Sequence, residues 1–452
     1  MSLQNPRGAS DLLFGEAYTL DRLVRTAAEV FERYAYKLIE TPCFENIEVF
    51  ARGIGQATDV VGKEMYNVFS ADATLRLAES RPLKPEQRLA LRPEGTAGVA
   101  RAVVQHNLVP PGSPAAKLWY FGPMFRHERP QKGRFRQFHQ IGVECLGAVE
   151  PTVDAEVVIM LMDYFDALGI PHAALTLKLN SMGDDACRPA YREQVREFIL
   201  AHSDALCPEC LRRADSNPLR AFDCKSPECQ QVMSQAPLIT NVLCGPCREH
   251  YETVKLLLKL ANIDFVEDPR LVRGLDYYTR TVFEVQVDAG LGAQNAIGGG
   301  GRYDKLLEEF GGKPTPGLGF AVGLERVKLV QEALGIVEED PRGPDVFVVT
   351  VSAECQHSAF TIVARLRQAG ISADMDHQGR SLKSQLKVAD KAAARYALII
   401  GPDELAQGHF KLRSMTAHSE ELLTFDALVT RLLSPTSPLS SVSHEHSKDT
   451  SQ

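Results

Sequence analysis

Long hydrophobic runs and an excess of positive charge are both missing from this sequence. No apolar stretch approaches the ~20 residues that span a bilayer, and the opening residues MSLQNPRGASDLLFGE lack the apolar core of a secretory signal. We therefore expect a cytoplasmic protein with no membrane contact. The 50 Lys and Arg residues stand against 58 Asp and Glu, which gives a net charge of −8. The chain as a whole is not a basic nucleic-acid binder, so a nucleic-acid partner would have to bind local basic patches on an acidic body.

Two common phosphate-binding motifs are missing as well. The segment AIGGGGRYDKL has glycine at all four positions 298–301. No Gly-Lys-Ser/Thr follows this run, so it is not a Walker loop, and it does not match the GxGxxG turn of dinucleotide-binding domains. Four consecutive glycines instead permit a close approach of the backbone to a ligand.

What is present describes a globular protein with more than one domain. The 452 residues are too many for a single hydrophobic core, so we expect two or three domains. Hydrophobic periodicity predicts helices over 10–39 and 152–168, the second with Thr152 as its cap. Between about 89 and 147 short strands alternate with turns. Strand-like sequence resumes at TRTVFEVQV, before a helix from about 320 to 334.

The last part of the chain is organised differently. The acidic run in ALGIVEEDPRGP, broken by Pro and Gly, predicts a linker over 333–343. Strands and helices alternate over 344–433, which predicts a small α/β domain with a mostly parallel sheet. Residues 434–452 are rich in Ser, Pro and Thr and have few apolar side chains, so we expect a disordered tail.

The densest group of charges lies in FRHERPQKGRFRQFHQIGVE, residues 125–144. RPQKGR is turn-like and its flanks alternate as strands do, which predicts two strands joined by a loop. Arg126, Gln140 and Glu144 can then share one face of the sheet, because residues spaced by even numbers point the same way. An arginine beside a glutamine and a glutamate suits an anionic phosphate next to a cationic amine. An exposed, charged hairpin would explain the same run without a ligand.

Three further segments carry groups suited to a ligand. In LRPEGTAG, Glu94 and Thr96 offer a carboxylate and a hydroxyl to an ammonium group, although a capping residue in a loop would have the same sequence. In LVRGLDYYTRTVFEV the rings of Tyr277 and Tyr278 project in opposite directions if the backbone is extended, so one phenol could meet a ligand while the other packs. In GLGFAVGLERV, Arg326 falls in the first turn of a helix, where it suits the terminal phosphates of a nucleotide.

Together and in this order, these segments resemble the class II aminoacyl-tRNA synthetases, and specifically the histidyl-tRNA synthetase family. Pro42 with its preceding helix is similar to the first class motif, at the dimer interface. Residues 119–144 resemble the second motif and 317–327 the third. RGLDYY and GGGGRYD are similar to the two histidine-specific signatures, and the resemblance runs from about residue 4 to 430.

The resemblance implies both an architecture and an activity. It implies an α+β catalytic domain over 1–332 with a mainly antiparallel sheet, an inserted helical, cysteine-rich subdomain at 185–255, and a C-terminal α/β anticodon-binding domain at 344–433. The implied enzyme is a homodimer that ligates L-histidine to histidine tRNA, using ATP with Mg²⁺. It forms a histidyl-adenylate intermediate and releases AMP and diphosphate.

The resemblance also assigns a histidine pocket. Its residues are Glu94, Gly95, Thr96, Arg126, Gln140, Glu144, Arg273, Tyr277 and Tyr278. Glu94, Thr96 and Gln140 would bind the α-ammonium group, and Glu144 and Tyr278 would hydrogen-bond the imidazole ring. A pocket that pairs both ring nitrogens leaves polar groups unsatisfied when any other amino acid enters.

The implied ATP site is rich in arginine. Its residues are Arg126, Glu128, Arg134 and Arg326. Arg126 and Arg273 would be the catalytic pair, on opposite sides of the α-phosphate, with Arg273 standing where other class members use a metal ion. Attack of a carboxylate on the α-phosphorus needs in-line placement and charge neutralisation more than proton transfer.

A basic stripe in the C-terminal domain gives one hint of a tRNA contact. Its residues, spaced by 3, 4, 4 and 4, are Arg380, Lys383, Lys387, Lys391 and Arg395. On a helix such spacing places all five on one face. A solvated helix face would have the same pattern.

Cysteines are concentrated in the predicted insertion, where six of the ten fall between residues 207 and 247. Disulfides are rare in the cytosol, so this density indicates a metal site. The motifs CPEC and CGPC form two CxxC knuckles, which predict a closed structural Zn²⁺ site. Its expected ligands are Cys207, Cys210, Cys244 and Cys247. Cys224 and Cys229 lie between the knuckles, and buried free thiols are the alternative to zinc.

Two other functional classes compete with the synthetase. One is a non-catalytic paralogue, such as the regulatory subunit of ATP phosphoribosyltransferase, which loses the anticodon domain and the substrate signatures; this sequence has both. The other is a zinc-dependent RNA-binding module. Simple RNA binding, however, needs no buried carboxylate beside phosphate-binding arginines.

Overall fold

The computed structural model describes residues 3–55, 58, 60–273, 277–291, 295–336 and 343–434. By its internal contacts the chain divides into two compact units, Met1–Glu338 and Glu339–Gln452. The predicted linker and tail stay predictions, because residues 337–342 and 435–452 lie outside the described residues. No helix in the described part of the chain combines the length and the apolarity that crossing a bilayer requires.

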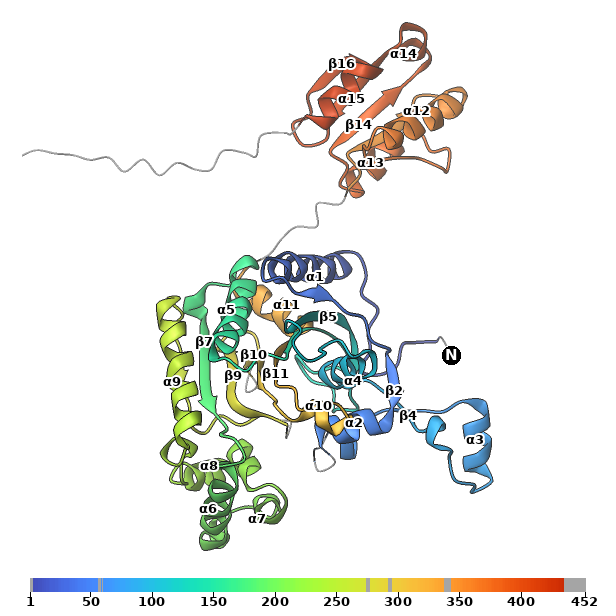
Figure 1. Cartoon of the computed structure of the whole chain (residues 1–452). Helices are drawn as coiled ribbons and strands as arrows, with labels where there is room; N and C mark the ends of the chain where they lie inside the picture. Colours follow the sequence, from blue (N-terminus) through green and yellow to red (C-terminus); the bar gives the residue numbers. More distant parts are fainter. Residues whose placement is uncertain are drawn as a thin grey trace, which may run out of the picture. The chain divides into compact units, whose positions relative to one another are not determined.

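The first unit is built on a sheet of eight strands (Figure 1). In spatial order they are β1 (Lys37–Leu38), β5 (Ala116–Phe125), β6 (Gln137–Leu146), β11 (Gly317–Gly323), β10 (Ala296–Arg302), β9 (Thr279–Val287), β7 (Leu175–Ser181) and β8 (Val266–Glu267). Every inner pair is antiparallel, and only the two edge pairs, β1 with β5 and β7 with β8, are parallel. The expected mainly antiparallel sheet is confirmed.

One face of this sheet carries the main hydrophobic core. The helices that contribute to it are α1 (Gly15–Arg33), α5 (Pro151–Ala167), α9 (Gly245–Leu260) and α11 (Leu324–Ala333). Helix α1 buries Leu23 and Phe31, which lie on one face at helical spacing. The ring centroid of Phe31 lies 5.9 Å from those of Trp119 and Tyr164 and 5.8 Å from that of Phe320. One aromatic side chain thus ties α1 to α5 and to two strands of the sheet.

Three helix boundaries differ from the sequence predictions. The helix expected over 10–39 is shorter, since α1 gives way to Ala35 with a φ of 63° and then to β1. Thr152 is not the cap of α5, because that helix already begins at Pro151, a residue whose missing N–H costs nothing in the first turn. The helix expected from about 320 begins at Leu324, because the preceding glycine-rich residues complete β11.

A group of smaller elements lies outside the main hydrophobic core. They are α2 (Ile47–Ile54), α3 (Ala71–Ala78), α4 (Thr96–His106), α10 (Leu306–Glu309) and a three-stranded sheet of β2 (Phe44–Asn46), β4 (Leu89–Leu91) and β3 (Asn67–Val68). Val99 and Val103 of α4 pack against Tyr120, Met124 and Tyr303 in a second core. This packing fixes the start of α4 beside the middle of β5 and β6.

The cysteine-rich segment forms a helical subdomain with its own core. Its helices are α6 (Arg188–Ala201), α7 (Pro208–Ser216) and α8 (Pro227–Met233). They lie together at one end of β7, and α9 runs back along that strand (Figure 1). The start of α9 belongs to the subdomain through Cys247, whereas Tyr251 and Val254 belong to the main core. Helix α9 therefore joins the predicted insertion to the sheet.

The second unit is an α/β domain on a mixed five-stranded sheet. In spatial order its strands are β13 (Ala373–Met375), β12 (Val346–Thr350), β14 (Tyr396–Ile400), β15 (His409–Ser414) and β16 (Glu420–Thr424), and its helices are α12 (Gln356–Gln368), α13 (Leu382–Lys391), α14 (Pro402–Gln407) and α15 (Phe425–Leu433). The first three strands are parallel. The expectation of a mostly parallel sheet is wrong for β15 and β16, which pair antiparallel. A connection of eight residues that contains α14 joins β14 to β15, and a short turn joins β15 to β16, so neither connection is long enough for a parallel crossover.

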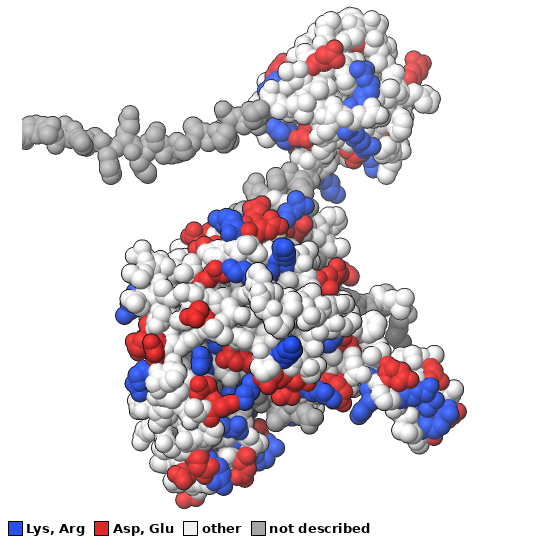
Figure 2. All heavy atoms as spheres, in the orientation of Figure 1, with Lys and Arg blue, Asp and Glu red and all other residues white. Residues whose placement is uncertain are grey.

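Charge is spread over the surface of both units. On the face shown in Figure 2, acidic and basic residues interleave over the first unit. This pattern agrees with a net charge of −8 that comes from many residues of both signs.

Candidate active site

A cavity of about 880 Å³ lies against β6, β9, β10 and β11 in the first unit. Small-molecule sites typically enclose ~300–1,000 Å³, so the space suits a substrate of moderate size. The residues predicted for histidine and ATP that line it are Glu94, Thr96, Arg126, Glu128, Arg134, Gln140, Glu144, Arg273, Tyr277, Tyr278 and Arg326. They come from segments up to 232 residues apart along the chain, from Glu94 to Arg326, and meet in one cavity.

Gly95 is the one predicted pocket residue outside the cavity lining. A Cβ atom at this position would lie 2.2 Å from the ring of Tyr120. The absence of a side chain at Gly95 therefore allows the start of α4 to pack against β5. Gly95 therefore contributes to the site by allowing its neighbours Glu94 and Thr96 to take their positions.

Glu94 caps α4 from the loop that precedes the helix. Its carboxylate accepts hydrogen bonds from the backbone N–H groups of Thr96 at 2.7 Å and Ala97 at 2.9 Å. Burial raises the pKa of this carboxyl, while the bond from Ala97 opposes the shift. Glu94 thus has the capping role that was the alternative explanation of the sequence LRPEGTAG. Each carboxylate oxygen keeps a second lone pair, so Glu94 can still accept a hydrogen bond from an ammonium group in the cavity.

Glu144 is almost fully buried, with an exposed fraction of 1%. The hydroxyl of Thr96 donates to one carboxylate oxygen at 2.7 Å, and the hydroxyl of Tyr303 donates to the other. Burial raises the pKa of Glu144 to about 8, although these two hydrogen bonds favour the ionised form. Gly319, directly across from Glu144 on β11, leaves the space for this carboxylate, since a Cβ there would lie 2.1 Å from its oxygen.

Gln140 lies four residues before Glu144 on β6. Its side-chain oxygen is buried and has no hydrogen-bond partner among the described residues. A buried amide oxygen without a partner costs free energy, which a donor in the cavity would offset. The ammonium group of an amino acid is such a donor.

The loop between β5 and β6 brings charged side chains to the cavity. Arg126 donates from Nε to the carbonyl oxygen of Pro93 at 2.9 Å, and Arg134 forms an ion pair of 2.7 Å with Glu128. Both arginines are half-buried, whereas Arg129 is exposed. The alternative of an exposed charged hairpin therefore fits only the tip of the loop.

Arg273 is held by a carboxylate and surrounded by phenols. Its Nη1 lies 2.5 Å from an oxygen of Glu284 on β9. The rings of Tyr277 and Tyr278 are 4.7 Å apart and both residues line the cavity. The expectation that the two rings project in opposite directions is wrong, because β9 begins only at Thr279 and the tyrosines precede the extended strand. Residues 274–276 of the RGLDYY signature lie outside the described residues.

The glycine run forms β10, between β9 and β11, and leaves room for these side chains. A Cβ at Gly299 would lie 2.9 Å from the guanidinium of Arg273, and a Cβ at Gly301 would lie 2.9 Å from the ring of Tyr278. The close approach that the sequence predicted for a ligand is made in the structure by side chains that line the cavity.

Arg326 lies in the first turn of α11 and reaches the loop between β5 and β6. Its Nε donates to the carbonyl oxygen of Gly133 at 3.1 Å, and its Nη1 donates to that of Ala296. Burial, followed by the positive charge of Arg134, lowers the pKa of Arg326. An anion placed between the two guanidinium groups would offset their repulsion.

Among the cavity residues that were not predicted from the sequence, three have polar side chains that bear directly on the site. They are Tyr303, Glu284 and Glu325. Tyr303 stands in the GGGGRYD signature, so the motif pointed to it. The backbone N–H and the ring of His139 bind Glu325, at 2.8 and 2.9 Å. Neither glutamate has a sequence signal of its own, because only the pairing of distant strands brings it to the cavity.

The cysteines fall into two separate groups, each compact enough to hold a metal ion. One consists of Cys207, Cys210, Cys224 and Cys229, and the other of Asp184, Cys187, Cys244 and Cys247. The predicted four-thiolate site that joins both knuckles is wrong as a ligand set, because each knuckle meets other residues of the described chain. The bends of the chain around α7 and α8 bring Cys224 and Cys229 to the first knuckle, which holds Cys207 and Cys210. The turn after β7 brings Asp184 and Cys187 to the second knuckle, which holds Cys244 and Cys247.

Comparison with known proteins gives one family for the first unit and a second family for the C-terminal domain. The family described as Histidyl-tRNA synthetase matches residues 8–327, and the family described as Anticodon binding domain matches residues 345–434. Histidine–tRNA ligase of Moorella thermoacetica is 47% identical over 95% of this chain and 97% of its own, and that of Anaeromyxobacter dehalogenans is 44% identical over 96% and 100%. Among solved structures, the apo histidyl-tRNA synthetase of S. aureus is 34% identical, with a TM-score of 0.78 over 95% of this chain and 100% of that chain. The chain thus belongs to the histidyl-tRNA synthetase family of class II aminoacyl-tRNA synthetases.

Proposed function

We propose that this chain is a histidine–tRNA ligase that forms histidyl-adenylate from L-histidine and ATP in the cavity and then transfers histidine to its tRNA. The first step releases diphosphate and the second releases AMP. The observation that supports this proposal most directly is the meeting of a buried carboxylate, Glu144, with the guanidinium groups of Arg126, Arg273 and Arg326 in one cavity.

The histidine end of the cavity is the part around Glu144. Its carboxylate accepts a hydrogen bond from an imidazole N–H, and the phenol of Tyr278 pairs with the other ring nitrogen. The carboxylate of Glu94 and the free oxygen of Gln140 accept from the α-ammonium group, with Thr96 between them. An amino acid without both ring nitrogens leaves Glu144 or Tyr278 unsatisfied in a buried site, which disfavours its binding.

The nucleotide end is the cationic part. Arg126 and Arg273 contact the α-phosphate from opposite sides and stabilise the charge that develops as the histidine carboxylate attacks the phosphorus. Arg326 binds the γ-phosphate, and the Glu128–Arg134 pair belongs to the ATP-binding loop. ATP enters with Mg²⁺ on its phosphates. The carboxylates of Glu284 and Glu325 offer oxygen ligands of the kind that this ion prefers.

We propose α13 of the second unit as a tRNA contact. Lys383, Lys387 and Lys391 are exposed on this helix at intervals of four residues, so they form one basic face. Arg380 and Arg395 lie outside the helix and are paired with Asp376 and Asp345, which shortens the predicted five-residue stripe to three lysines.

We propose that the enzyme is a cytoplasmic homodimer. Pro42 and its neighbourhood carry the resemblance to the dimer motif, and two large apolar side chains beside it, Leu38 and Phe44, are 62% and 52% exposed. A dimer interface would cover them. In the reducing cytoplasm the cysteines of the insertion stay available as thiolates for a structural Zn²⁺ ion.

Histidine-dependent exchange of pyrophosphate into ATP tests the proposed function. The purified chain should catalyse exchange with L-histidine and should charge histidine tRNA. A regulatory paralogue or a simple RNA-binding protein would do neither, and the relatives named above give the regulatory alternative no support. Exchange that proceeds equally with other amino acids, or does not occur, would reject the proposal.

A further inference from the structure

We infer that the insertion binds two structural Zn²⁺ ions, one at each cysteine group, and that these ions brace two sides of the active-site cavity. The first site (site A) has the ligands Cys207, Cys210, Cys224 and Cys229. The second (site B) has the ligands Asp184, Cys187, Cys244 and Cys247. The bracing of the cavity rests on the proposed function, whereas the metal sites themselves do not.

Site A has the dimensions of a tetrahedral thiolate site. All four sulfur atoms lie within 4.8 Å of one another, and the sulfurs of Cys207 and Cys224 are 3.8 Å apart. Zinc–sulfur bonds of 2.3 Å in a tetrahedron place neighbouring sulfurs about 3.8 Å apart. Four thiolates close the coordination shell, so this ion would be structural.

The backbone around site A orients its sulfur ligands. The N–H of Cys207 donates to the sulfur of Cys229 at 3.2 Å, the kind of outer hydrogen bond that orients a metal ligand. Cys207 is also the residue before the first turn of α7, and Cys210 lies in that turn. The partial positive charge at the start of a nine-residue helix stabilises negative sulfur nearby.

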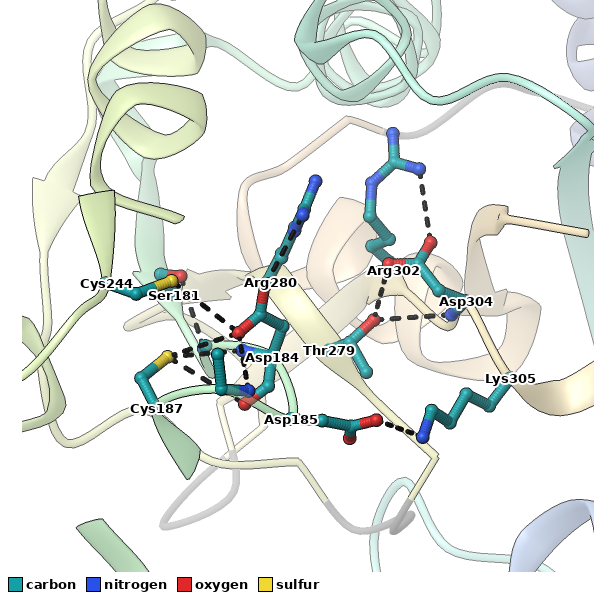
Figure 3. A network of polar contacts seen from close by, with 12 residues as sticks. Ser181, Asp184, Asp185, Cys187, Cys244, Thr279, Arg280, Arg302, Asp304 and Lys305 are labelled. Atoms are coloured by element: carbon teal, nitrogen blue, oxygen red, sulfur yellow. Dashed lines mark hydrogen bonds and ion pairs between the residues drawn. The ribbon is translucent and has the colours of Figure 1, made fainter. Parts of the chain in front are cut away.

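Site B mixes one carboxylate with three sulfurs. One oxygen of Asp184 lies 3.6 Å from the sulfur of Cys187 and 3.6 Å from that of Cys244 (Figure 3). A zinc ion with bonds of about 2.0 Å to oxygen and 2.3 Å to sulfur would place these atoms about 3.5 Å apart. The other oxygen of Asp184 lies 3.5 Å from the guanidinium of Arg280, which fixes the carboxylate in this orientation.

Site A supports a wall of the cavity. Its ligand Cys224 itself lines the cavity, together with the neighbouring residues Asp223 and Lys225. This segment has no sheet to hold it, since it lies between the short turn Pro218–Asp223 and α8. An ion that ties Cys224 to the start of α7 therefore fixes the position of the wall.

Site B supports the backbone that carries Tyr278. The turn after β7 pairs with Arg280 through two backbone bonds, from Met182 N–H to its carbonyl oxygen at 2.6 Å and from its N–H to the carbonyl oxygen of Gly183 at 2.8 Å. Arg188, which follows the ligand Cys187, donates to the carbonyl oxygen of Tyr278 at 2.7 Å. Loss of the ion would loosen this turn and, with it, the tyrosine proposed to bind imidazole.

The metal content of the full-length protein tests the two sites. The chain should contain two equivalents of zinc after purification without chelator. Cys229→Ser should remove the ion of site A and Cys244→Ser the ion of site B, each leaving one equivalent. Cys43→Ser and Cys355→Ser, which change cysteines outside both groups, should keep two.

Cobalt replacement keeps the test independent of variants that fail to fold. The wild-type protein grown with Co²⁺ in place of zinc should show thiolate-to-cobalt charge-transfer absorption from seven thiolates in two tetrahedral sites. One equivalent of metal would overturn one of the sites, and the variant that leaves the metal content unchanged identifies which. A chain with no bound metal, whose cysteines all react with an alkylating reagent or form disulfides, would overturn both.

Histidine kinetics test the link to the cavity. Cys244→Ser should raise the KM for histidine by at least about fivefold and change kcat by less, because it loosens a binding wall and removes no catalytic group. Cys244→Ser lacks a ligand of site B, so added Zn²⁺ should not restore its KM for histidine. Added Zn²⁺ should restore the KM of wild-type protein that a chelator has stripped of metal. An unchanged KM in a variant that has lost one equivalent would overturn the bracing role. Exchange that is absent from the zinc-loaded wild type would instead reject the proposed function and leave the metal sites standing.

Discussion

Glu144 combines burial, hydrogen bonding and a raised pKa in one side chain. It is buried, it accepts hydrogen bonds from Thr96 and Tyr303, and its pKa rises to about 8 because burial outweighs both bonds. A carboxyl group with this pKa is largely protonated at pH 6 and ionised at pH 9. A neutral imidazole that donates an N–H needs the ionised form as its acceptor.

Histidine binding should therefore tighten with rising pH in a way that depends on Glu144. Below pH 8 binding must first remove the proton from the carboxyl, so affinity should rise up to about pH 8 and then level off. Glu144→Gln keeps the size of the side chain and an acceptor for Thr96 but cannot ionise. Isothermal titration with histidine should show affinity lower by roughly tenfold to a hundredfold and a flatter pH profile. The same pH profile in both proteins would show that Glu144 does not bind the imidazole.

Arg273 is the residue whose loss should affect the chemical step most. Arg273→Ala removes the cation that we propose acts on the α-phosphate, so the rate of adenylate formation should fall about a hundredfold or more. Glu284 is the ion-pair partner of this arginine, and the change leaves its carboxylate without that cation but still hydrogen-bonded to Gln286. Arg273→Ala combined with Glu284→Gln separates the two effects in a single-turnover assay. Recovery of the rate in the double variant would mean that the unpaired carboxylate, and not the missing cation, causes the loss.

At the scale of elements, strand pairing decides what the sequence could reveal. The two strands around the RPQKGR loop, the helix before Pro42 and the α/β alternation after 344 follow from local periodicity, and all are present. The register between strands could not be predicted in this way. No local pattern shows that Gly319 lies across from Glu144, or that Glu284 forms an ion pair with Arg273. The six clustered cysteines predicted a metal site. Which cysteines lie together depends on how the chain bends between them, and the spacing of cysteines in the sequence does not show this.

Gly319 gives this register a direct test. Gly319→Ala would bring a methyl group within 2.1 Å of the Glu144 carboxylate, in a strand whose backbone cannot move aside easily. We expect the KM for histidine to rise at least about tenfold, with thermal stability lower by about 1–3 kcal/mol. Gly15→Ala is the matched control, since nothing lies within 4 Å of its added methyl group. Equal behaviour of the two variants would show that β11 does not shape the histidine end.

At the scale of the whole molecule, the two units divide the proposed reaction. The first unit holds the cavity in which we propose that the adenylate forms, whereas the family matched to residues 345–434 is an anticodon-binding domain. The net charge of −8 means that tRNA must be recognised by local basic faces, of which α13 is one.

A charge reversal on α13 should separate the two steps. Changing Lys383, Lys387 and Lys391 together to glutamate should leave pyrophosphate exchange at its wild-type rate. The KM for tRNA in the charging assay should rise at least about tenfold, and the salt dependence of that KM should become weaker. Changing three exposed glutamines of the same unit outside α13, Gln368, Gln378 and Gln407, to glutamate controls for a general gain of negative surface charge. A normal KM for tRNA would place the contact elsewhere on the domain.

A structure of the chain with histidine and an ATP analogue that cannot react would show directly where both substrates bind. We expect imidazole between Glu144 and Tyr278, the α-ammonium group at Glu94 and Gln140, and the α-phosphate between Arg126 and Arg273. Histidine bound away from Glu144, or a nucleotide whose α-phosphate touches neither arginine, would contradict this expectation.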